Sequence, residues 1–102
     1  MELKAGSRWR SAVCDTEVVV VRAPSGSASL ECGGQPMIAH DAERPDGATL
    51  DDAFAGGTQM GKRFADPESG IEVLATKGGA GSLSLDGQLL ALKDAKPLPS
   101  SD

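Results

Sequence analysis

Turn-forming residues recur along this chain and limit the length of any helix or strand. The 102 residues include 13 glycines and six prolines. Because both residue types interrupt regular structure, this composition favours short strands joined by turns over long helices. The sequence therefore predicts a mostly β protein, a small domain of short antiparallel strands and hairpins.

The apolar residues suffice for one modest core. A chain of this length buries roughly two-thirds of the surface that its unfolded form exposes. Aromatic residues make up 3% of the chain, so Trp9, Phe54 and Phe64 are the only large anchors and aliphatic residues must supply the rest. We assign residues 1–93 to a single domain and residues 94–102, which are polar and contain proline, to a flexible tail.

Charge and hydropathy exclude several classes of function. The formal net charge is -5, and the basic residues are scattered, whereas phosphate binding requires clustered Lys and Arg. We expect no nucleic-acid binding. The longest apolar run, residues 18–21, is far too short to span a bilayer, and no charged-then-apolar leader opens the chain. We therefore expect a cytoplasmic protein without membrane contact.

The first half of the chain predicts three strands. A leading strand covers residues 7–13 (SRWRSAV), where Trp9 alternates with arginines and should point inward. Residues 16–23 (TEVVVVRA) are a β-branched run, and residues 28–32 (ASLEC) form a strand that ends at a Gly-Gly turn. Four consecutive valines indicate a strand that is buried on both faces or held at an interface.

Residues 38–65 lack periodicity and predict an irregular connector. Within it, residues 49–57 (TLDDAFAGG) could form one or two helical turns, capped by Thr49, with Asp51 and Asp52 near the positive end. A connection of this length without clear structure is uncommon in a compact domain. We interpret it as a linker or as a segment that contacts a partner.

The remaining residues predict a second set of strands. A turn at residues 66–70 (DPESG) precedes a strand at residues 71–76 (IEVLAT). Residues 81–93 (GSLSLDGQLLALK) read as a hairpin around Asp86-Gly87, because this dipeptide suits a tight turn between alternating apolar residues.

The two ordered halves align with one another. A shift of 53 positions lays residues 16–37 on residues 69–90 without a gap. Turn glycines and apolar positions keep the same phase, as a structural repeat requires. We therefore predict two copies of one β unit, at about residues 7–37 and 66–93, joined by the connector. The identical pairs include Val20 with Val73, Gly26 with Gly79, and Gly34 with Gly87.

Two stretches carry a resemblance to a known family. Residues 11–21 (SAVCDTEVVVV) and 30–37 (LECGGQPM) are similar to the desulforedoxin family of rubredoxin-related β modules, which carry a Cys-x-x-Cys-Gly turn and a later Leu-x-Cys-Cys-Gly. Cys14 and Cys32 match two of the four cysteines, whereas Ser11 and Gly33 occupy the other two positions. The resemblance covers about a quarter of the chain. It implies a scaffold that holds iron with four sulfurs and pairs as a dimer.

Two thiolates are too few for such a centre. Tetrahedral iron or zinc needs four ligands, so we expect no cofactor in the monomer. Cys14 and Cys32 remain open to three interpretations: two buried apolar side chains, ligands of Zn or Fe, or a disulfide. As ligands, they would be completed by His40 with Asp15 or Asp41, or by the cysteine pair of a second chain.

No catalytic motif is recognisable. His40 is the only histidine and lies in a polar stretch, where a solvated side chain is the ordinary expectation. A general base needs a positioned partner, and none is evident. The glycines in residues 77–82 precede a strand rather than a helix, so we interpret them as a turn and not as a phosphate loop. We expect no catalytic residues and no activity of the chain alone.

The preferred hypothesis is a small non-catalytic accessory or protein-interaction subunit, which binds a protein partner or a second copy of itself. A paired strand edge gives affinity and an ordering loop gives specificity. The alternative is a metal-binding or electron-transfer protein that uses Cys14 and Cys32, shared across a dimer. The residues expected to face the partner are Val18, Val19, Val20, Val21, Asp51, Asp52 and Phe54.

Overall fold

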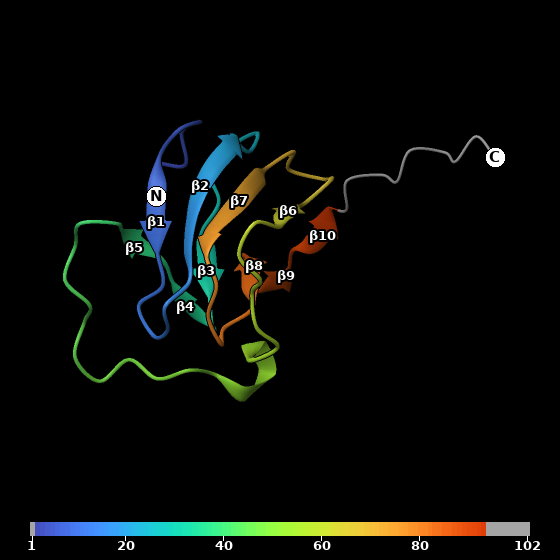
Figure 1. Ribbon diagram of the computed structural model, residues 1–102. Coiled ribbons are helices and arrows are strands. Elements are labelled where there is room, and N and C mark those ends of the chain that lie inside the picture. Colours follow the sequence, from blue (N-terminus) through green and yellow to red (C-terminus); the bar gives the residue numbers. More distant parts are fainter. Residues whose placement is uncertain (1, 94–102) are drawn as a thin grey trace.

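Two antiparallel sheets of short strands make up the computed structural model, which describes residues 2–93 (Figure 1). This confirms the predicted fold class, whereas the predicted tail at residues 94–102 lies outside the described residues. The strands are β1 (Arg8–Arg10), β2 (Glu17–Arg22), β3 (Leu30–Cys32), β4 (Gln35–Pro36), β5 (Ile38–Ala39), β6 (Arg63–Ala65), β7 (Glu72–Lys77), β8 (Leu83–Leu85), β9 (Gln88–Leu89) and β10 (Ala91–Lys93).

The larger sheet has six strands in the order β10-β6-β7-β2-β1-β5, and the smaller has four in the order β4-β3-β8-β9. All neighbours pair antiparallel. The long strands β2 and β7 therefore lie at the centre of the larger sheet, and the short strands β5 and β10 form its edges.

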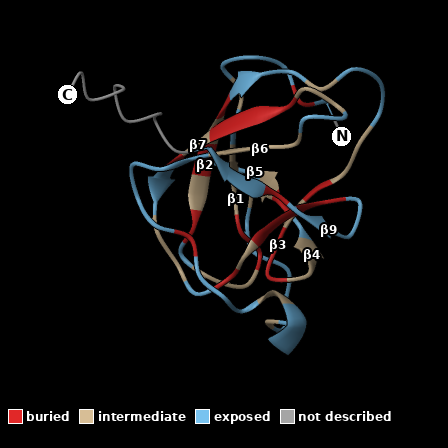
Figure 2. Ribbon diagram, turned by 90° about the vertical axis from the view of Figure 1, so that its right-hand side faces the viewer, coloured by how far each residue is buried: buried red, intermediate tan, exposed pale blue. Residues whose placement is uncertain are grey.

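The core lies between the two sheets. Alternate residues of β2 and β7, such as Val18 and Val73, pack in one cluster with Leu30 and Leu83 from the smaller sheet. All four are almost fully buried, and the exposed segments surround them (Figure 2). Trp9 is half-buried against the same cluster, as its alternation predicts.

The valine run alternates between core and surface, which corrects the expectation of a strand buried on both faces. Val18 and Val20 are each 1% exposed, whereas Val21 is 42% exposed. Since β2 has a paired strand on each side, it also offers no free edge. Val18 and Val20 are therefore core residues and cannot meet a partner while the chain is folded.

The strand order reads the same from both ends of each sheet. Exchanging β1, β2, β3, β4 and β5 with β6, β7, β8, β9 and β10 leaves both orders unchanged. Val19 lies opposite Leu74 at the centre of the β2–β7 ladder, and the register shifts once on either side of this pair. In the smaller sheet, Glu31 opposite Ser84 is the corresponding centre.

Backbone hydrogen bonds recur at a fixed spacing in the two halves. Four bonds in the first half have a counterpart exactly 55 residues later, and the bond from Met37 N to Leu30 O has one 53 residues later. The four at the longer spacing run from Gly6 N to Val20 O, Ser7 N to Lys4 O, Ser11 N to Thr16 O and Val20 N to Ser7 O, with counterparts that begin at Gly61, Lys62, Asp66 and Ala75.

The gapless shift of 53 is therefore wrong over β2 and β7, which correspond at 55. The connection from β2 to β3 is two residues longer than the connection from β7 to β8. Gly26 in the longer loop has φ +88°, while Gly79 does not have positive φ and lies against Thr16. These two glycines do different work, because one shapes an open turn and the other permits a close approach.

The connector contains one short 3-10 helix, η1 (Asp52–Phe54), and the strand β6. Asp51 caps η1 by accepting a hydrogen bond from Ala53 N at 3.0 Å, which corrects the expected cap at Thr49. Residues 40–51 have no regular structure and pass around the outside of the sheets (Figure 1). Asp51 N donates to Gly33 O, so the end of this excursion is attached to the turn after β3.

Candidate functional site

A tight turn before β2 carries Cys14. The Ser11 hydroxyl oxygen accepts hydrogen bonds from the backbone N–H groups of Val13 and Cys14, both at 3.0 Å. Ser11 is fully buried, so these bonds are shielded from water and fix the turn. Its short side chain suits this position because a hydroxyl can accept two local backbone donors.

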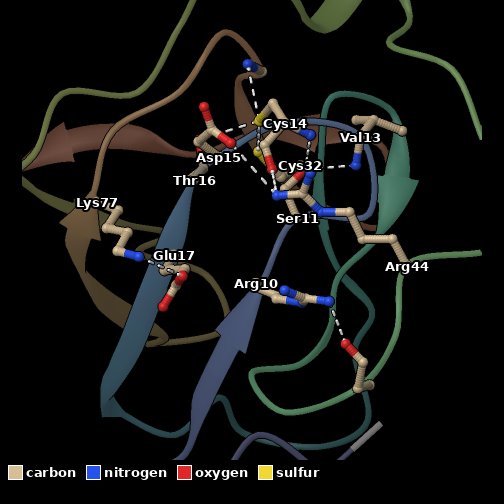
Figure 3. A network of polar contacts seen from close by, with 12 residues as sticks. Arg10, Ser11, Val13, Cys14, Asp15, Thr16, Glu17, Cys32, Arg44 and Lys77 are labelled. Atoms are coloured by element: carbon tan, nitrogen blue, oxygen red, sulfur yellow. Dashed lines mark hydrogen bonds and ion pairs between the residues drawn. The ribbon is translucent and has the colours of Figure 1, made fainter.

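The two cysteines meet although they are 18 residues apart in sequence. The sulfur atoms of Cys14 and Cys32 lie 3.8 Å apart (Figure 3). Cys32 ends β3 and is 0% exposed, whereas Cys14 is half-buried. Solvent therefore reaches the pair from the Cys14 side.

Polar groups from two other segments surround the Cys14 sulfur. Gly81 N donates to Cys14 Sγ at 3.4 Å, and the Cys14 thiol donates to Thr16 Oγ1 at 3.3 Å. A Cβ atom on Gly81 would lie 3.0 Å from Cys32 Sγ and 2.9 Å from Gly33 N. Glycine is required at this position because the loop before β8 presses directly against the cysteines.

The surroundings shift the pKa values of the two thiols in opposite directions. Burial raises the pKa of Cys14, but hydrogen bonds from Ser11, Thr16 and Gly81 outweigh it and lower the pKa to about 7. Burial, and then the negative charge of Cys14, raise the pKa of Cys32 to about 12. One thiol therefore ionises near neutral pH and its neighbour stays protonated.

Arg44 crosses over the Cys14 turn from the connector. Its Nη2 donates to Cys14 O at 2.8 Å and lies 3.6 Å from Asp15 Oδ1 (Figure 3). Asp15 is therefore paired with a guanidinium. The ion pair is solvent-exposed and contributes little stability, but the bond to the Cys14 carbonyl places a positive charge at the mouth of the site.

The expected metal ligands do not come together. Across residues 2–93, no group of three or more His, Cys, Asp and Glu side chains is arranged to hold a metal ion. His40 lines a separate cavity with Glu17 and Thr76. One chain therefore offers Cys14 and Cys32 without an imidazole or carboxylate to complete the shell, which does not fit a four-ligand centre.

The expected partner-facing residues are divided between core and surface. Asp51 and Asp52 are exposed, and Phe54 and Val19 are half-buried. Val21 also reaches solvent. The acidic residues of the connector are therefore available to a partner, in contrast to Val18 and Val20.

The second half carries an equivalent turn without thiols. Asp66 accepts hydrogen bonds from Glu68 N at 3.4 Å and Ser69 N at 3.2 Å, 55 residues after the bonds at Ser11. Leu85 ends β8 as Cys32 ends β3. The two halves thus share a backbone arrangement, and only the first can carry thiol chemistry.

Sequence reasoning missed three residues that shape the site: Thr16, Arg44 and Gly81. Thr16 follows Cys14 by two residues, and its full burial is the only trait that a strand pattern could have suggested. Arg44 and Gly81 lie 30 and 67 residues from Cys14. No local pattern indicates such contacts.

The length and hydropathy of a membrane-crossing helix are not reached by any helix within residues 2–93. Comparisons with protein-family models, curated proteins and solved structures found no match to this chain.

Proposed function

We propose that this chain is a small non-catalytic protein-interaction subunit, built on two desulforedoxin-like units that have lost their metal chemistry. The observation that carries this proposal is the pair of turns at Ser11 and Asp66. Each turn wraps two backbone N–H groups around a side-chain oxygen. In the family that residues 11–37 resemble, a cysteine sulfur stands at the Ser11 position.

The matching strand order of the two halves supports a duplicated unit. In particular, the β2–β7 ladder is symmetric about Val19 and Leu74, including its two irregularities. An ancestral pair of chains joined head to tail would produce this arrangement, because a two-fold interface brings equivalent strands together. The scaffold then folds without metal, since its core is a continuous apolar cluster.

The docking surface that we propose is the acidic segment, defined as residues 40–52. Five carboxylates and one guanidinium give it a net charge of -4, compared with -5 for the whole chain. Complementary charge steers association and selects partners. The partner is therefore a protein with a basic surface. The charged residues are Asp41, Glu43, Arg44, Asp46, Asp51 and Asp52, and all are exposed.

The docking proposal is tested by co-purification of the tagged chain from its native cell, followed by mass spectrometry. The Asp41→Asn/Glu43→Gln double variant should lose the partner, and rising salt should release it. The matched control is Glu2→Gln/Glu68→Gln, which removes the same charge from exposed positions elsewhere and should keep the partner. A chain that purifies alone, or equal recovery by both variants, would overturn the proposal.

The metal-binding or electron-transfer alternative is favoured by one distance. Two ligands of a tetrahedral zinc–sulfur centre lie roughly 3.8 Å apart, given bonds of about 2.3 Å, and Cys14 Sγ and Cys32 Sγ are 3.8 Å apart. Two chains would then lend one pair each. Such a centre requires Cys32, which is fully buried, to become exposed.

Elemental analysis of protein purified without oxygen separates the two functions. About half a zinc or iron ion per chain would establish the shared four-sulfur centre. Less than about a tenth of an ion per chain would end the metal alternative and leave the interaction subunit.

A further inference from the structure

We propose that Cys14 and Cys32 form a reversible disulfide by exchange with a low-molecular-weight disulfide, with Cys14 as the attacking thiol and Cys32 as the resolving thiol. This activity goes beyond partner binding and does not depend on it. The two sulfurs are in contact at 3.8 Å, and a disulfide bond is about 2.0 Å long. Closure therefore needs a combined displacement of only about 1.8 Å.

The order of the two steps follows from burial. Cys14 is half-buried and Cys32 is 0% exposed, so an incoming disulfide reaches Cys14 first. Cys32 lies behind Cys14, within reach of the mixed disulfide that would form there. A pair with one accessible and one enclosed sulfur is the arrangement that resolves a mixed disulfide inside the chain.

The groups around Cys14 are arranged to hold a thiolate. Gly81 N–H points at its sulfur at 3.4 Å, and the buried Thr16 hydroxyl lies 3.3 Å from it. When Cys14 is ionised, that hydroxyl can turn and donate. Both groups are fixed by packing, so the stabilisation requires no rearrangement during attack.

The exchange balances without any further reactant. Cys14 releases its proton to solvent, and its thiolate attacks one sulfur of the small disulfide. The sulfur–sulfur bond of the small molecule breaks, and its first thiolate leaves and takes a proton from solvent. Cys32 then attacks Cys14 Sγ, and its proton passes to the second departing thiolate. Two protein thiols are oxidised to one disulfide while one small disulfide is reduced to two thiols.

Oxidised glutathione is the probe for the test, applied to the full chain after treatment with a chelator. Mass spectrometry should show that the wild-type chain loses two hydrogens without a lasting adduct, and that dithiothreitol reverses the change. Cys32→Ala should accumulate a glutathione adduct on Cys14. Cys14→Ala should form no adduct while folded.

Digestion of the oxidised wild-type chain without reductant keeps the test independent of variant folding. The expected product is one peptide pair that joins Cys14 to Cys32. Oxidised chains joined to one another, or a wild-type adduct that never resolves, would overturn the proposal.

Discussion

Two cysteines in contact have different chemistry here because their neighbours differ. Cys14 meets the Gly81 amide and the Thr16 hydroxyl, and both favour the thiolate. Cys32 is enclosed by core residues, and a charge on Cys14 opposes a second charge beside it. The first thiol is therefore reactive near neutral pH, and the second acts only after Cys14 has reacted.

Alkylation by iodoacetamide measures this difference, because the thiolate is the reacting form. The pKa of Cys14 is lowered from 9.0 to about 7, so its labelling rate should rise with pH and reach half its maximum near pH 7. Cys32, whose pKa is raised to about 12, should stay unlabelled in the folded chain. A midpoint at pH 9, or equal labelling of both residues, would contradict the assignment.

The Gly81→Ala variant tests the close approach of the loop to the cysteines. Its methyl group would lie 2.9 Å from Gly33 N and 3.0 Å from Cys32 Sγ, and the backbone nitrogen cannot move without displacing the β3 turn. We expect a loss of about 1–3 kcal/mol in the free energy of unfolding, measured in urea. Ala80→Ser at the exposed neighbouring position is the control and should change little. An unchanged midpoint for Gly81→Ala would show that the loop is loosely packed.

At the scale of strands, one carboxylate ties three neighbours of the larger sheet together. Glu72 on β7 lies 2.7 Å from Lys93 Nζ on β10 and 3.4 Å from Arg63 Nη1 on β6. Its counterpart Glu17 pairs only with Lys77, at 3.2 Å. The Glu72 side chain is 10% exposed and that of Glu17 is 31% exposed. The edge strand β10 therefore depends on Glu72.

The Glu72→Gln variant should lose roughly 1 kcal/mol of unfolding free energy, and Glu17→Gln should lose less. The hydrogen bond from Lys93, followed by the charges of Lys93 and Arg63, lowers the pKa of Glu72 below 4.5 in spite of its burial. A lowered pKa means that this stability is present above pH 4.5 and is lost as the pH falls through the folded-state value. Urea unfolding between pH 3 and 7 measures both effects. Equal losses in the two variants would refute the special role of Glu72.

The long strands were predictable because their signal is local. Residues 16–23 and 71–76 predict β2 and β7 within about one residue, and the Asp86-Gly87 turn joins β8 to β9 as expected. Both turn residues have positive φ, which this dipeptide tolerates. The strand β6 was missed because three residues in an irregular connector become a strand only through pairing with β7 and β10.

At the scale of the whole molecule, two similar halves differ in function. The first half holds the thiols, and the acidic segment joins it to a second half whose equivalent turn is closed by Asp66. Sequence periodicity could reveal the repeated phase, but not the two-residue offset between the loops. The cysteine pair could be anticipated from its resemblance to a four-sulfur site. Its real neighbours, Arg44 and Gly81, could not, because only the folded chain brings them there.

Native mass spectrometry of the tagged chain, isolated without oxygen from its own cell, tests the central claim most directly. That claim is that a β scaffold with half of its sulfur ligands works by binding another protein. We expect one assembly whose mass equals this chain plus a different, basic polypeptide, without the mass of iron or zinc. A homodimer that carries one metal ion between its chains would contradict the claim.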